Sequence, residues 1–150
     1  MTPEMVRIPP PIWTLLFLMI AGGASYAMPP SVNLRVLPLG IVLVVSGIAL
    51  AVSAFVRFRS EGTEIDPVSV SNKSLVINGP YRFTRNPMYL SLVVFSLGIA
   101  FIAGAWPMFV VPVLVFAVAA GMHIPLEEEK MRRQFGAAYD AYVVEVRRWI

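Results

Sequence analysis

The stretch that decides the fold is MYLSLVVFSLGIAFIAGAWPMFVVPVLVFAVAAGM, residues 88–122, which holds no charged residue in 35 positions. As one α-helix it would be about 52 Å long, at about 1.5 Å per residue. The hydrocarbon core of a bilayer is only about 30 Å thick. We therefore predict two membrane spans, at about 88–103 and 107–122, joined by a hairpin turn from Gly104 to Pro107.

Two further apolar runs precede this hairpin, at residues 11–28 and 34–58. A cleaved signal peptide is the competing interpretation of the first run, but the region before it carries one basic residue, Arg7, and one acidic residue. We favour a retained span. The sequence thus predicts a single domain over residues 1–150, all-α, with four transmembrane helices.

Small residues recur along the second run and predict close helix packing. Gly40, Gly47, Ala51 and Ala54 are seven, four and three residues apart, which places them on one helical face. Small side chains on one face let a neighbouring helix approach closely.

The composition excludes several functional classes. The chain is 57% hydrophobic and 14% charged, against about a quarter charged in a soluble domain. It has no cysteine, and its one histidine is His123, so we predict no metal site. The net charge of +3 could suggest nucleic-acid binding, but the basic residues flank the apolar runs and we predict no nucleic-acid partner.

The basic residues also predict the orientation in the membrane. Four spans place both termini and the loop 59–87 on one side. Of the 12 Lys and Arg residues, only Arg35 falls on the other side. The positive-inside rule therefore predicts that both termini and the loop are cytoplasmic, in the inner (plasma) membrane if the cell is bacterial.

The pattern after Pro125 predicts an amphipathic C-terminal helix over residues 126–148, lying on the membrane surface. Its acidic start and basic end match the helix dipole. Its apolar positions are four, four, three and four residues apart: Met131, Phe135, Tyr139, Tyr142 and Val146.

Two polar clusters are candidates for chemistry. In NGPYRFTRNPMYL, residues 78–90, Pro87 can start a helix and thereby places Arg85 and Asn86 near a helix N-terminus, which suits an anionic group. An interfacial anchor for lipid headgroups is the equally weighted alternative. The second cluster is Glu127 to Glu129, on the same side of the membrane. Arginines of the first cluster could offset these carboxylates, so we predict one paired site.

At these two clusters the chain resembles the integral membrane methyltransferases, which include isoprenylcysteine carboxyl methyltransferases and bacterial phospholipid N-methyltransferase-like proteins. The resemblance covers about residues 62–149. The shared residues are Gly62-Thr63, Leu75-Val76, Gly79-Pro80-Tyr81-Arg82, Arg85-Asn86-Pro87-Met88-Tyr89, Glu127-Glu128, Phe135-Gly136, Tyr139, Tyr142 and Val146 to Trp149.

The resemblance implies an enzyme that transfers a methyl group from S-adenosylmethionine, bound at the cytoplasmic end of the last spans, to a lipophilic acceptor. The acceptor is an isoprenylcysteine-type carboxylate or a phospholipid-type amine. Carboxyl methyltransferases commonly have histidine where this chain has Asn86, which moves the chain toward the phospholipid branch. The implied catalytic residues are Arg85 and Glu128, and the implied cofactor contacts are Gly79, Tyr81, Arg85, Asn86, Tyr89, Glu127 and Glu128.

The residue chemistry matches this cofactor. Arg85 can bind its carboxylate, and Glu127 or Glu128 can accept from its ammonium or ribose hydroxyls. Tyr81 or Tyr89 can lie against the adenine or the sulfonium. An amine acceptor must lose a proton, which Glu128 or a water could receive.

Two other functions remain open from the sequence. A membrane reductase using NADPH has less support, because no Gly-rich fingerprint follows a strand. In a non-enzymatic membrane scaffold or accessory subunit, Arg85 and Glu128 would only form a structural ion pair. The expected partners are the bilayer and a lipid or lipidated substrate, and no obligate protein partner is evident.

Overall fold

A computed structural model describes residues 8–28, 33–60 and 74–150. Within these ranges the chain forms helices and no strand, which confirms the all-α prediction for the described residues. Gly62, Thr63, Arg7, Lys73 and part of the predicted loop 59–87 lie outside them. The elements are α1 (Pro10–Ala27), α2 (Leu37–Ser60), η2 (Gly79–Arg82), α3 (Pro87–Ala103), η3 (Trp106–Phe109), α4 (Val110–Val118), η4 (Ala119–His123), α5 (Ile124–Phe135) and α6 (Ala137–Glu145).

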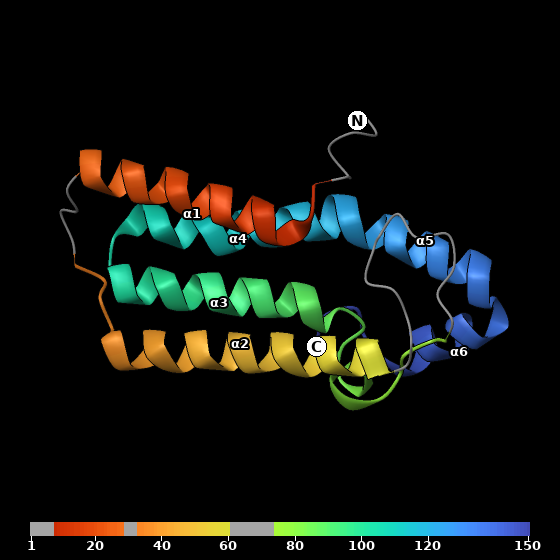
Figure 1. Ribbon diagram of the computed structural model, residues 1–150. Helices are drawn as coiled ribbons and strands as arrows, with labels where there is room; N and C mark the ends of the chain where they lie inside the picture. The colour runs from red at the N-terminus through yellow and green to blue at the C-terminus, as the bar shows by residue number, and fades with distance from the viewer. Residues whose placement is uncertain (1–7, 29–32, 61–73) are drawn as a thin grey trace.

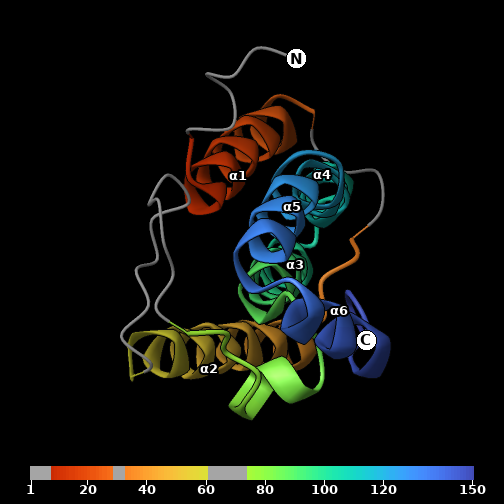
Figure 2. The same cartoon turned by 90° about the vertical axis from the view of Figure 1, so that its right-hand side faces the viewer.

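Helices α1 to α4 lie side by side as a bundle (Figure 1), and follow one another in space in the order α2, α3, α4, α1 (Figure 2). Helices α1 and α3 run in one direction, and α2 and α4 run in the other. The start of α3 therefore lies beside the end of α2. We refer to this end of the bundle, from which α5 extends, as the polar end.

Among the described residues, three helices are long and apolar enough to cross a membrane: α1, α2 and the continuous helix Trp106–Phe135. Helix α3 is equally apolar in character but has 17 residues. Its bounds match the predicted span 88–103, and α1 and α2 match the predicted spans 11–28 and 34–58 to within a few residues. The chain is a helical membrane protein.

The small residues of α2 pack against α3, as predicted. A Cβ atom added to Gly98 would lie 2.7 Å from the backbone nitrogen of Val44 and 2.8 Å from the carbonyl oxygen of Gly40. A Cβ atom on Gly47 would lie 2.9 Å from the backbone nitrogen of Phe95. The two helix backbones are therefore in direct contact, which only glycine permits at these positions.

The predicted hairpin is confirmed at Gly104. This residue ends α3 with φ 70°, and its N–H donates to the carbonyl of Ala100 at 2.8 Å. Helices commonly end at a residue in the left-handed conformation, and that residue is usually glycine. Pro107 then lies in η3, which leads into α4.

The predicted fourth span, 107–122, is the first part of a longer helix, which continues from Trp106 to Phe135. Between α4 and α5 it passes through one π-helical turn, η4. Pro125 follows this turn directly, in the first positions of α5. Since the π-helical turn already replaces the usual hydrogen bonds to the carbonyl four residues earlier, proline is accommodated without ending the helix.

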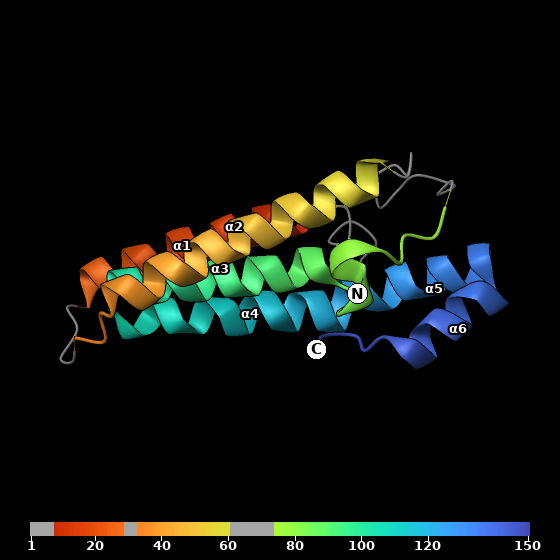
Figure 3. The same ribbon diagram turned by 90° about the horizontal axis from the view of Figure 1, so that it is seen from below.

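The prediction of one helix over residues 126–148 is wrong. Helix α5 ends at Phe135, and Gly136 adopts φ 51° and ψ −126°. The chain then reverses, so that α6 runs back beside α5 (Figure 3). Because of this reversal, Tyr139, Tyr142 and Val146 are buried within the protein against Met131 and Phe135, instead of lying on the membrane surface.

Gly136 offers a direct test of this reversal. A Cβ atom at this position would meet nothing within 4 Å, so the cost of Gly136→Ala is conformational alone. We expect the variant to lose about 1–2 kcal/mol of stability, because alanine disfavours this backbone conformation. Thermal unfolding in detergent measures this, with Gly23→Ala in α1 as the control, which also has open space but no positive φ. Equal melting temperatures for the two variants would contradict the reversal.

Candidate active site

The two polar clusters meet at the polar end of the bundle. Arg85 lies between η2 and α3, and Glu128 lies in the first part of α5. Nη2 of Arg85 is 3.4 Å from Oε1 of Glu128, and the two side chains are only 10% and 7% exposed. The predicted pairing of the two clusters, which lie 43 residues apart in the sequence, is therefore confirmed by this contact.

One cavity brings most of the predicted site residues together. Its polar lining includes Arg85, Asn86, Glu127 and Glu128, and two aromatic side chains, Tyr81 and Tyr89, also line it. The rest of its wall is largely apolar and comes from several elements: Pro9, Pro10, Phe58, Leu75, Val76, Pro87, Met88, Leu92 and Met131. The cavity thus combines a charged wall with a surface suited to a hydrophobic group.

Gly79 is the predicted site residue that the structure does not bring into this cavity. It lines a separate groove along α2, together with Pro80 and Arg57. Its φ of 64° is a conformation that glycine adopts freely. In the structure Gly79 is the first residue of η2, the short helix that precedes Arg85.

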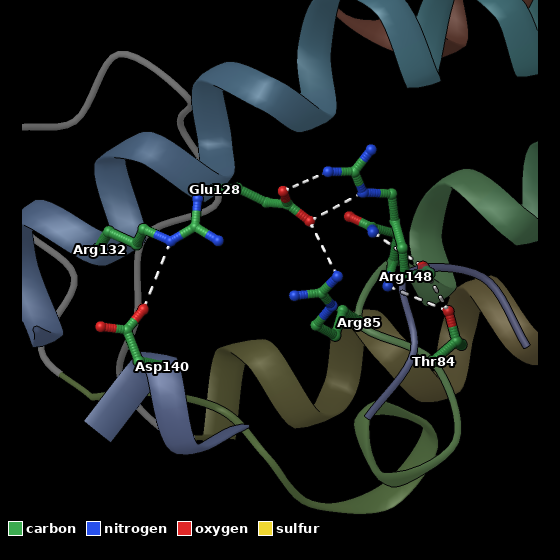
Figure 4. A network of polar contacts seen from close by, with 7 residues as sticks. Thr84, Arg85, Glu128, Arg132, Asp140 and Arg148 are labelled. Atoms are coloured by element: carbon green, nitrogen blue, oxygen red, sulfur yellow. Dashed lines mark hydrogen bonds and ion pairs between the residues drawn. The ribbon is translucent and has the colours of Figure 1, made fainter. Parts of the chain in front are cut away.

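Arg148 was not among the predicted site residues, yet it holds Glu128 by two hydrogen bonds (Figure 4). Nε of Arg148 donates to Oε1 of Glu128 at 3.0 Å, and Nη2 donates to Oε2 at 2.6 Å. These hydrogen bonds raise the pKa of Arg148, which stays charged. A sequence signal for Arg148 was present, because it lies within the shared residues 146–149. The predicted uninterrupted helix, however, would place Arg148 far from the site, since it lacks the reversal at Gly136.

Arg85 retains two buried donors, Nε and Nη1. Neither has a hydrogen-bond partner among residues 8–28, 33–60 and 74–150. Unpaired donors of a buried guanidinium are costly. An anionic group in the cavity would satisfy them.

Glu127 lies on the same cavity wall and contacts a different partner. The hydroxyl of Tyr89 donates to Oε1 of Glu127 at 2.6 Å. The Tyr89 ring in turn lies 6.1 Å from the ring of His123, measured between centroids. Tyr89 therefore fixes the position of one carboxylate, while arginines hold the other.

The aromatic residues of α6 support the turn that carries Arg85. The hydroxyl of Tyr142 donates to the carbonyl oxygen of Tyr81 at 2.6 Å. Burial raises the pKa of Tyr142, so its phenol stays protonated and can donate. Burial likewise raises the pKa of Tyr81, whose neutral ring lines the cavity.

The C-terminal segment, residues 146–150, is hydrogen-bonded to the residues before α3. The backbone N–H of Arg85 donates to the carbonyl of Arg147 at 3.0 Å. The hydroxyl of Thr84 and the Nδ2 of Asn86 donate to the carbonyl of Arg148 at 3.2 Å and 2.9 Å. The amide nitrogen of Asn86, a predicted cofactor contact, therefore holds the C-terminal segment here.

The phospholipid methyltransferase family matches residues 36–138, which is more than half of the chain. The chain belongs to this family. The predicted resemblance to membrane methyltransferases is thereby confirmed. No curated protein and no solved structure matches the chain significantly.

In this membrane methyltransferase, the family match covers both charged clusters of the cavity, from Arg85 to Glu128. It ends at residue 138, before Tyr139, Tyr142 and Arg148. Those three residues belong to the site through the contacts that the structure shows.

The cavity carries charged side chains of both signs. Arg85 and Arg148 share the single carboxylate of Glu128, which leaves a net positive charge on that side. Glu127, hydrogen-bonded to Tyr89, supplies a carboxylate to the same cavity, which Lys130 also lines. Such an arrangement suits a ligand that carries both an anionic and a cationic group.

Proposed function

We propose that this protein transfers a methyl group from S-adenosylmethionine to a lipophilic acceptor at the cytoplasmic face of the membrane. The observation that supports the proposal is the pair of buried donors on Arg85 that have no partner among the described residues, in the same cavity as Glu127. Family membership supports methyl transfer, and methyltransferases of this family generally use this cofactor.

The residues of the cavity match the groups of the cofactor. Nε and Nη1 of Arg85 would donate to its carboxylate. Glu127 would accept from its ammonium or its ribose hydroxyls, and the rings of Tyr81 and Tyr89 would lie against the adenine or the sulfonium. When bound, the cofactor supplies an electrophilic methyl group on a sulfonium.

The protein's own contribution to the reaction is position and exclusion of water. Arg85 and Glu127 lie on a chain segment and a helix that hydrogen bonds hold in place, and positioning of this kind lowers the entropic part of the barrier. The apolar wall, which includes Phe58, Leu92 and Met131, would hold the hydrophobic part of the acceptor and keep water out.

We propose a phospholipid-type amine as the first candidate acceptor, and an isoprenylcysteine-type carboxylate as the second. The matched family favours the amine. Asn86, in place of the histidine common in carboxyl methyltransferases, favours it too. A carboxylate acceptor needs no base, whereas an amine must release a proton to a cavity group or to water.

We also propose that α1, α2, α3 and the helix from Trp106 make four spans, with the polar end in the cytoplasm. Helix α3 lies between α2 and α4 over its length (Figure 1), so it has the same depth as its neighbours. Arg35 alone among the described basic residues lies before α2, at the opposite end of the bundle. The positive-inside rule supports this orientation.

Calorimetric titration of the purified protein in detergent tests the cofactor assignment. We expect saturable binding of S-adenosylhomocysteine, because its carboxylate and ammonium have partners in Arg85 and Glu127. NADPH is the matched control and should give no saturable heat. Saturable binding of NADPH without binding of S-adenosylhomocysteine would reject the proposal in favour of a reductase.

Membranes that contain the protein, incubated with a donor labelled in its methyl group, identify the acceptor. Label that base releases indicates an ester and hence a carboxylate acceptor. Label that stays on a lipid headgroup indicates an amine. Membranes with the Arg85→Gln variant should show neither product above background.

A further inference from the structure

We propose that Arg148 is a positioning residue of the methyl-donor site, which acts on Arg85 through Glu128. This inference rests on the proposed function and assigns the two glutamates different roles. Glu128 orients Arg85, whereas Glu127 is the carboxylate that meets the cationic part of the ligand.

The first observation concerns the hydrogen bonds of Glu128. Both of its oxygens accept from Arg148, at 3.0 Å and 2.6 Å, and Arg85 approaches Oε1 only to 3.4 Å. A carboxylate held by a bidentate arginine has most of its charge compensated. Glu128 therefore attracts Arg85 enough to orient it without taking all of its donors.

The second observation concerns the hydrogen-bond donors of Arg85. Because Arg148 occupies Glu128, Nε and Nη1 of Arg85 remain without a partner in the part of the chain that the structure describes. Without Arg148, both oxygens of Glu128 would be open to the planar fork of Arg85, which would then pair with the protein instead of the ligand. Arg148 thus keeps Arg85 available for an anion.

The third observation concerns the C-terminal segment, which fixes Arg148 in this position. Three hydrogen bonds join its backbone carbonyls to Thr84, Arg85 and Asn86. The Trp149 ring lies 4.6 Å from the ring of Phe116, between centroids, on the helix that carries Glu128. The segment therefore contacts both of the elements that Arg148 links.

The test compares two ligands that differ in the group that Arg85 would bind. S-adenosylhomocysteine carries the carboxylate, and 5′-methylthioadenosine has the same nucleoside thioether without the amino-acid part. For Arg148→Gln we expect the Kd of S-adenosylhomocysteine to rise by about tenfold or more, the usual effect of a lost charge-assisted hydrogen bond. The Kd of 5′-methylthioadenosine should change by less than about twofold, within the error of such comparisons.

Arg148→Lys guards against a general loss of structure. Lysine keeps the charge beside Glu128 but not the bidentate geometry, so the loss of S-adenosylhomocysteine binding should be smaller than for glutamine. Arg133→Gln is the matched control, since Arg133 pairs with exposed Glu129 on the same helix as Glu128. It should leave both ligands unaffected.

A double-mutant cycle with Glu128→Gln shows whether Arg148 acts through Glu128. We expect strongly non-additive losses, with Arg148→Gln adding little in the Glu128→Gln background. Additive losses, an unchanged Kd of S-adenosylhomocysteine in Arg148→Gln, or an equal loss for both ligands would each overturn the positioning role. If the unmodified protein binds neither ligand, the proposed function itself fails.

Discussion

Arg85→Gln is expected to weaken the binding of S-adenosylhomocysteine by about 100-fold, since two charge-assisted hydrogen bonds to its carboxylate would be lost. The protein should still fold. Glu128 keeps both hydrogen bonds from Arg148 in this variant, so no buried carboxylate is left unpaired. Calorimetry in detergent measures the Kd, and thermal unfolding verifies the folded state.

Arg82→Gln is the control for this experiment. Arg82 lies three residues before Arg85, at the end of η2, but it is exposed and does not line the cavity. The two variants remove the same charge from the same short segment. A loss in Arg82→Gln as large as in Arg85→Gln would mean that general electrostatic attraction holds the ligand, and would contradict a specific carboxylate site.

Gly98→Ala is expected to destabilise the bundle by about 2–3 kcal/mol, the upper part of the range for overpacked interiors. The added Cβ would lie 2.7 Å and 2.8 Å from backbone atoms of Val44 and Gly40. Backbone atoms of a helix cannot move aside as a flexible side chain can. Helices α2 and α3 must therefore separate, which thermal unfolding in detergent will measure as a lower melting temperature.

Gly22→Ala in α1 makes the same chemical change where a Cβ atom meets nothing within 4 Å. Alanine has the higher helix propensity, so this variant should be neutral or more stable by up to about 1 kcal/mol. If the two variants melt at the same temperature, the close contact between α2 and α3 is not what stabilises the bundle.

The parts of the fold that the sequence predicted depend on local chemistry or on length. The hairpin at Gly104 follows from an apolar run too long for one span, and the contact of α2 with α3 follows from small residues on one helical face. The sequence left open whether the helix continues across Pro125. Proline interrupts a helix whose preceding turn is α-helical, and the π-helical turn η4 removes that condition.

The candidate site was predictable only in part. Arg85 and Glu128 each stand beside a span boundary, so membrane topology alone brings them to the same face. Arg148 depends on the reversal at Gly136. A glycine directly after a helix whose last turn holds two arginines, here Arg132 and Arg133, is a known stop signal. The spacing of apolar residues nevertheless continues across Gly136, because α5 and α6 bury those residues against each other.

The π-helical turn at Ala119–His123 determines where the helix can lose one residue. Such a turn holds one residue more than the α-helical turn that it replaces. Deleting Gly121, around which there is open space, would therefore restore regular winding and still direct Glu127 and Glu128 toward Arg85. In α5 beyond Pro125 there is no extra residue of this kind. Deleting one residue there would rotate all the residues that follow by about 100° about the helix axis.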